Sequence, residues 1–144
     1  MLHHLACGIF IALLAASSPG VAQNMPAPPN AELTIIWPPD GEVIQGGRLW
    51  VRMGLKNMGI APANVRKEGT GHHHFLVDTD LPPLDEPIPS DKNHIHFGAG
   101  QTEARLIDLP PGEHTLQLML GDHDHFPHDP PVVSKKITII VAPY

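Results

Sequence analysis

The histidines are the residues of this sequence whose type and spacing suit chemistry. The chain has eleven, and nine of them lie between residues 72 and 128. Neutral imidazole is a good ligand for Cu(II), Zn(II) and Ni(II), and residues i and i+2 of a strand point to the same face. The histidines with this spacing, or in the short cluster after residue 122, are the ligands we expect for one metal site: His72, His74, His94, His96, His123, His125 and His128.

The composition narrows the choice of metal ion. Cys7 is the one cysteine, and it lies in an N-terminal apolar segment, so a thiolate site is excluded from the rest of the chain. Imidazole-rich sites suit Cu(II) and Zn(II), and copper stands above zinc in the usual affinity order. We expect Cu(II) first and Zn(II) second, with affinity falling as the pH drops through about 6.5, where imidazole becomes protonated.

Other residues of the same region have structural interpretations. His114 follows Leu109-Pro110-Pro111-Gly112 and shares its phase with alternating leucines, so we expect it to brace a corner. His73 is out of phase with its neighbours, which also indicates a structural role. Asp122 and Asp124 can orient ligating imidazoles by accepting a hydrogen bond from the ring nitrogen that does not bind the metal. An alternative for the paired histidines is a buried imidazole–carboxylate network with Asp78, Asp122 or Asp124 and no metal.

The N-terminus has the pattern of a secretory signal peptide over residues 1–22. An apolar run of about twelve residues from Leu5 to Ala16 is too short to span a bilayer, and Gly20-Val21-Ala22 fits a small-residue cleavage site. The chain after cleavage contains no thiol, which suits an oxidising compartment. We therefore expect a periplasmic or secreted protein without a membrane segment, whose partners are a metal ion and another periplasmic protein.

The overall composition indicates one domain without a nucleic-acid partner. The formal charge is −6, from 9 Lys+Arg and 15 Asp+Glu, so no basic surface is implied. Seventeen prolines and thirteen glycines leave little room for long helices. Residues 23–31 are expected to form a flexible Pro-rich leader, and residues 32–144 a single domain.

The elements that must position the histidines are predicted to be short strands. Alternating apolar residues separated by Pro/Gly turns mark seven of them, at 32–37, 48–55, 72–78, 93–97, 102–109, 114–120 and 132–141. This pattern predicts an all-β fold, an immunoglobulin-like antiparallel β-sandwich of about seven strands. In such a sandwich, the loop before residue 72 and the loop after residue 120 lie at the same end.

The position of residues 93–97 decides whether the clusters meet. Ile95 and Phe97 read as core-facing, which turns His94 and His96 outward. The clusters converge if 93–97 pairs with 72–78. If 93–97 belongs to the opposite sheet, they are separated by the sheet spacing of about 10 Å. The sequence leaves this choice open.

Three stretches together resemble an uncharacterised bacterial family, domain of unknown function 4399. They are Gly69–Asp78, His94–Glu103 and Leu109–His128, and the resemblance covers about residues 33–141. The resemblance implies a secreted domain with this same set of histidines, and no established activity.

Three functions are compatible with these patterns. The favoured one is a periplasmic metal-binding protein, such as a chaperone, buffer or sensor. The second is a structural or interaction sandwich with a metal-free imidazole network. The third is a small metalloenzyme in which three imidazoles and an open position activate water, with Asp122 or Asp124 as base. No residue pattern in the sequence names a substrate, so we expect no catalytic residues.

Overall fold

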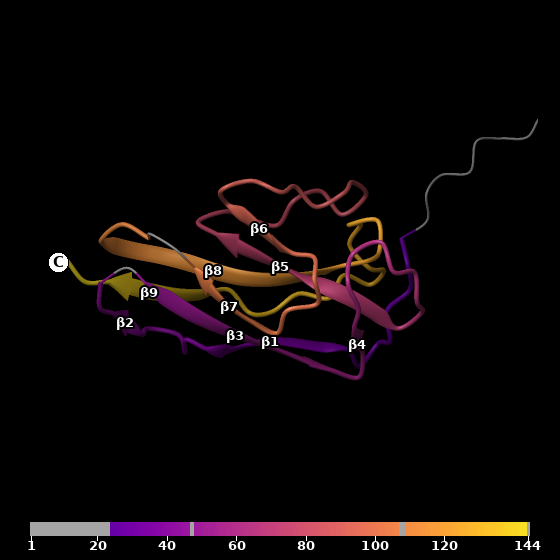
Figure 1. Ribbon diagram of the computed structural model, residues 1–144, viewed down its shortest axis with the longest axis horizontal. Coiled ribbons are helices and arrows are strands. Elements are labelled where there is room, and N and C mark those ends of the chain that lie inside the picture. The colour runs from indigo at the N-terminus through magenta and orange to yellow at the C-terminus, as the bar shows by residue number, and fades with distance from the viewer. Residues whose placement is uncertain (1–23, 47, 107–108, 144) are drawn as a thin grey trace, which may run out of the picture.

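The fold is an all-β sandwich of two sheets, as predicted (Figure 1). The computed structural model describes residues 24–46, 48–106 and 109–143, so the expected signal peptide lies outside the described residues. No helix able to cross a membrane is found in these ranges. Their strands are β1 (Glu32–Trp37), β2 (Val43–Ile44), β3 (Leu49–Lys56), β4 (Gly59–Ile60), β5 (Thr70–Val77), β6 (His94–Phe97), β7 (Glu103–Leu106), β8 (Gly112–Gly121) and β9 (Ile137–Val141).

The two sheets have different sizes. The smaller has the order β1-β3-β7, and the larger has the order β2-β9-β8-β5-β4, with β6 also paired to β5. Each of the seven predicted strands has a counterpart. Two further strands, β2 and β4, are not predicted from the sequence; each is two residues long, and they pair in parallel with β9 and β5, respectively. Strands this short carry no readable alternation, so the sequence pattern does not reveal them.

Alternating side chains of β3 and β8 fill the space between the sheets. Leu116, Leu118 and Leu120 of β8 are completely buried and belong to the same apolar cluster as Leu49 and Val51 of β3. Burying a leucine side chain contributes roughly 1.5–3 kcal/mol. This core therefore supplies the main drive for folding, and it lies on the inner face of the larger sheet.

Strand β5 is buried on both faces, which is unusual for a sandwich strand. Phe75 and Val77 point into the main core, whereas Leu76 joins a smaller cluster with Ile88 and Met119 on the outer face. The cover comes from the β5–β6 loop (residues 78–93) and the β8–β9 loop (residues 122–136). This second layer explains why the apolar residues of β5 show no alternation.

Strand β6 pairs antiparallel with β5, in the same sheet. His96 lies opposite His74, and Ile95 lies opposite Phe75. Ile95 and Phe97 face the main core as expected, so His96 points to the outer face together with His74. The pairing that the sequence left open is therefore the one that lets the histidine clusters meet.

Residues 24–31 pack on the domain, in contrast to the leader expected there. Met25 and Ala27 are buried, and the backbone forms two hydrogen bonds with Asp129 in the β8–β9 loop, of 2.9 and 3.0 Å. The prolines in this segment led to the prediction of a flexible leader, because a Pro-rich composition is typical of a chain without a packed core.

The last strand is also shorter than predicted: it begins at Ile137. Residues 132–134 still pair with β8 through Leu120 N–Val132 O and Ser134 N–Leu118 O, but the ladder is interrupted because Leu118 N donates to the hydroxyl of Ser134 and not to a backbone carbonyl.

Candidate metal centre

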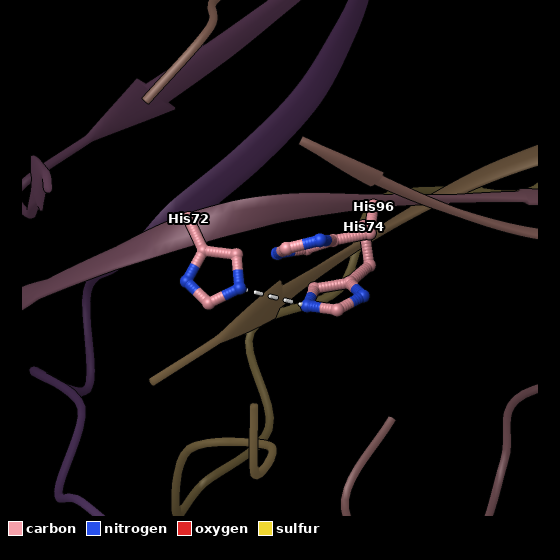
Figure 2. A group of neighbouring side chains, drawn as sticks. All are labelled: His72, His74 and His96. Carbon is pink, nitrogen blue, oxygen red and sulfur yellow. Dashed lines mark hydrogen bonds between the residues drawn. The ribbon is translucent and has the colours of Figure 1, made fainter. Parts of the chain in front are cut away.

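Three imidazole rings gather on the outer face of the larger sheet (Figure 2). His72 and His74 project from β5, and His96 projects from the neighbouring β6. Each ring offers one nitrogen, and these three atoms lie within 4.8 Å of one another. The Nε2 atoms of His72 and His74 are 3.0 Å apart. The i, i+2 spacing on β5 and the cross-strand register to β6 together produce this arrangement.

The rings are removed from water and poorly supplied with protein partners. His72 and His74 have no exposed surface, and His96 is partly buried. Among the described residues, no hydrogen-bond partner is found for Nδ1 of His72, Nδ1 of His74 or Nε2 of His96. Leaving a buried polar atom unpaired costs about 1–3 kcal/mol. Three such atoms in one cluster indicate a site built to receive a ligand.

Burial keeps these imidazoles in the neutral form. Desolvation, together with smaller effects of the neighbouring imidazoles, lowers the pKa of His72 from 6.5 to about 4 and that of His74 to about 2. The pKa of His96 is lowered for the same reasons, burial first and His125 second. Neutral imidazole is the form that ligates a metal ion, so the folded chain presents the rings ready to bind.

A fourth ring, that of His125, lies beside the three. Its centroid is 4.8 Å from that of His96 and 5.0 Å from that of His72. His125 belongs to the β8–β9 loop, where Asp122 is buried and its Oδ1 accepts hydrogen bonds from the backbone of Asp124 and Phe126, each of 2.9 Å. Asp122 therefore shapes the loop that carries His125.

Two glycines leave room for the rings, and sequence reasoning did not identify them. A Cβ atom at Gly98 would lie 2.5 Å from Nε2 of His96, and one at Gly121 would lie 2.8 Å from Nε2 of His74. Neither distance is compatible with ordinary packing. The signal was present in the sequence, because each glycine stands next to a histidine cluster, but glycine is also common in turns.

The other three histidines expected in the site make different contacts. His94 Nδ1 lies 2.9 Å from Oδ1 of Asp91, and His123 Nε2 lies 3.0 Å from Oδ2 of Asp124. The ring of His128 is buried between two backbone carbonyls, 3.1 Å from Thr70 O and 3.5 Å from Leu120 O. In the described part of the chain, these rings are not members of the group of ligating atoms formed by His72, His74 and His96.

His114 and His73 have the structural surroundings expected of them. His114 lies between Oδ2 of Asp78 (2.7 Å) and the carbonyl of Pro110 (2.8 Å), and so braces the corner before β8. Burial alone would lower its pKa, but these two acceptors raise it overall. His73 points to the inner face and contacts the carbonyl of Gln101 at 2.9 Å through Nδ1. Burial lowers its pKa more than this contact raises it.

The arrangement of His72, His74 and His96 can hold one metal ion. Three imidazoles from two hydrogen-bonded strands are fixed by the sheet, and one nitrogen of each ring lies within 4.8 Å of the other two. Borderline divalent ions prefer such donors. Hard ions such as Ca²⁺ and Mg²⁺ require oxygen ligands, and no carboxylate hydrogen-bonds these three rings among the described residues.

Comparison with known proteins places the chain in a family. No curated protein matches it. A solved structure, the solution structure of the PKD domain from human KIAA0319, aligns with 90% of this chain and 93% of that one, at 11% identity and a TM-score of 0.42. The family model described as domain of unknown function (DUF4399) matches residues 51–142, which is more than half of the chain and includes all three histidine clusters. The chain therefore belongs to the DUF4399 family, as its motifs indicated.

Proposed function

We propose that this protein is an exported metal-binding protein of the periplasm that holds one divalent transition-metal ion through His72, His74 and His96. One observation carries the proposal: three imidazoles from adjacent strands, two of them completely buried and the third partly buried, place their ligating atoms within 4.8 Å of one another. Cu(II) and Zn(II) are the two ions that this donor set suits, and the affinity order of divalent ions favours copper.

The contacts of the carboxylates favour metal binding over a metal-free imidazole network. Asp78, Asp91 and Asp124 each contact a histidine, but these partners are His114, His94 and His123. Each of these is a separate histidine–carboxylate pair, and none of them includes His72, His74 or His96. In the ranges that the structure describes, the rings of His72, His74 and His96 contact no carboxylate.

The same contacts argue against hydrolytic catalysis. A metal-bound water needs a nearby base, and Asp122 and Asp124 were the candidates. Oδ1 of Asp122 already accepts two backbone hydrogen bonds, and Asp124 contacts His123. His72 and His74 are completely buried, so a substrate has little access from their side. These features support binding and release of an ion as the activity.

The periplasmic location is supported by the sequence. The pattern of residues 1–22 is that of a secretory signal, and the chain beyond it has no cysteine that oxidation could damage. An imidazole site remains intact under oxidising conditions, where a thiolate site would not.

Metal uptake by the purified protein tests the proposal. We expect stripped protein to bind close to one equivalent of Zn(II) or Cu(II) above pH 7, measured by elemental analysis after dialysis and by competition with a chromophoric chelator. His96→Gln should weaken binding at least tenfold. The matched variant His94→Gln, two residues away on the same strand, should retain it. Failure of the wild-type protein to take up either ion would remove the proposal.

A further inference from the structure

Four imidazole rings, not three, surround the site. The six distances between the ring centroids of His72, His74, His96 and His125 are 4.8, 5.0, 5.0, 5.0, 5.8 and 4.8 Å. Four points whose six separations are nearly equal lie at the corners of a tetrahedron. The ring centroids therefore have a nearly tetrahedral arrangement. The nitrogens of His125 are not part of the group in which the ligating atoms of His72, His74 and His96 lie within 4.8 Å of one another, so ligation by His125 requires its ring to turn toward that group.

This arrangement can be compared with the geometry of bound metal ions. A Zn–N bond of about 2.0–2.1 Å puts an imidazole centroid about 3.2 Å from the ion, so a tetrahedral set has centroids about 5.2 Å apart. A square-planar set instead has four separations of about 4.5 Å and two of about 6.4 Å. The longest observed separation is 5.8 Å, between His74 and His125, which matches the tetrahedral case better.

The backbone around His125 holds the fourth ring in place. The carbonyl of His125 accepts a 2.8 Å hydrogen bond from the backbone of Ile88, in the β5–β6 loop. Its own N–H donates to the carbonyl of Asp122 at 3.0 Å. The residue has a φ of 70°, in a region that non-glycine residues rarely adopt. Both covering loops thus fix an unfavourable backbone conformation that directs His125 to the cluster.

We infer that His125 is a fourth ligand and that the site is a tetrahedral four-imidazole site for Zn(II). This inference rests on the proposed metal-binding function and makes it more specific. Zn(II) adopts tetrahedral coordination readily, whereas Cu(II) prefers a tetragonal one. Four protein ligands also leave no position for water, which is the property of a holding site and not of a catalytic one. The order of metals expected from the sequence is thereby reversed.

Substitution with Co(II), a spectroscopic stand-in for Zn(II), tests the inference. We expect wild-type protein to give the intense visible absorption of four-coordinate Co(II), unchanged by added azide. His125→Ala should still bind Co(II), but azide should now alter its spectrum, because an exchangeable position has opened. Zn(II) affinity should fall at least tenfold in this variant. His123→Ala, in the same loop, should behave as wild type.

The outcomes separate the two proposals. If wild-type protein binds metal but its Co(II) spectrum is weak or responds to azide, or if His125→Ala leaves the spectrum and the affinity unchanged, the four-ligand inference is wrong and the metal-binding function stands. If wild-type protein binds none of these ions, the proposed function fails, and the inference fails with it. Because His125 lies on a partly exposed loop, the variant should keep the β-sheet circular dichroism of the wild type.

Discussion

At the scale of single residues, the site depends on small neighbours as much as on the imidazoles. Gly98 and Gly121 have no side chain to displace the rings of His96 and His74. Gly98 is not among the residues with positive φ, so its backbone accepts alanine. A substitution to alanine should therefore act through steric overlap with the His96 ring and not through backbone strain. The space around a ligand can therefore be tested separately from the ligand itself.

Gly98→Ala should weaken Zn(II) binding by about tenfold or more, because the new methyl group must displace the His96 ring that it would overlap. Tenfold corresponds to about 1.4 kcal/mol. The metal-free protein should lose little stability, since a ring at the end of a side chain can rotate. Affinity by chelator competition and urea unfolding in EDTA measure the two effects. Gly59→Ala is the matched control; equal affinity in both variants would contradict the steric explanation.

The His114–Asp78 pair should make stability depend on pH with a defined sign. Burial lowers the pKa of His114, but its hydrogen bonds to Asp78 and Pro110 raise it overall above 6.5. The folded state therefore binds protons more tightly than the unfolded state. The resulting stabilisation is complete below about pH 6.5 and is lost as the pH rises through the raised pKa.

In Asp78→Asn, the free energy of unfolding should no longer fall as the pH rises. The pH-dependent change that is removed should be less than about 1 kcal/mol, because the Asp78 side chain is 41% exposed and solvent screens the pair. Urea unfolding in EDTA between pH 6 and 9 measures it. Asparagine tolerates the φ of 52° at this position, and its amide oxygen can still accept from Thr115 N. Asp85→Asn serves as the exposed control. Identical pH slopes for wild type and Asp78→Asn would show that the pair contributes nothing.

At the scale of elements, the sequence predicted strands best where one face meets the core. Alternation located β3 and β8 to within a few residues, because their apolar and polar positions face different surroundings. For β5, the apolar pattern did not show which face points to the core, since Phe75 and Leu76 are both buried, on opposite faces. Its second cover consists of loops, and loop packing has no sequence period.

The sequence predicted the type of ligand in the candidate site, imidazole, better than it predicted which histidines belong to the site. The i, i+2 rule correctly placed His72 and His74 on one face, and the apolar pattern of Ile95 and Phe97 turned His96 outward. Pairing of β6 with β5 depends on tertiary contacts, so the sequence did not settle it. The hydrogen bonds that engage His94, His123 and His128 form only once the loops fold, and neither residue type nor spacing reveals them.

The β8–β9 loop should act on the metal through His125. Asp122→Ala removes the acceptor of two backbone hydrogen bonds and should lower Zn(II) affinity about as much as His125→Ala does. Asp122→Asn should restore most of the affinity, because an amide oxygen accepts the same bonds. Combining Asp122→Ala with His125→Ala should weaken binding no further than either change alone. Fully additive losses in chelator competition would show that Asp122 acts independently of His125.

At the scale of the whole molecule, the candidate site lies outside the core that folds the chain. The apolar cluster between the sheets uses the inner face of β5, whereas the imidazoles use its outer face. The sandwich does not need a metal to bury Leu116, Leu118 and Phe75. We therefore expect the metal-free protein to be folded, unlike small domains whose core is replaced by a zinc site.

Zn(II) should nevertheless stabilise the molecule, because it joins β5, β6 and the β8–β9 loop, three segments far apart in the chain. An ion that binds only the folded state adds about 2.7 kcal/mol at a free concentration of 100 times its Kd. For a domain of this size, that raises Tm by several degrees. At the same Zn(II) concentration, His96→Gln should lose half or more of the Zn(II)-dependent rise in Tm, because binding at least tenfold weaker leaves at most about 1.4 kcal/mol of stabilisation. His94→Gln should keep the full rise. An equal rise in both variants, measured by differential scanning calorimetry, would place the ion away from the three rings, whatever its affinity.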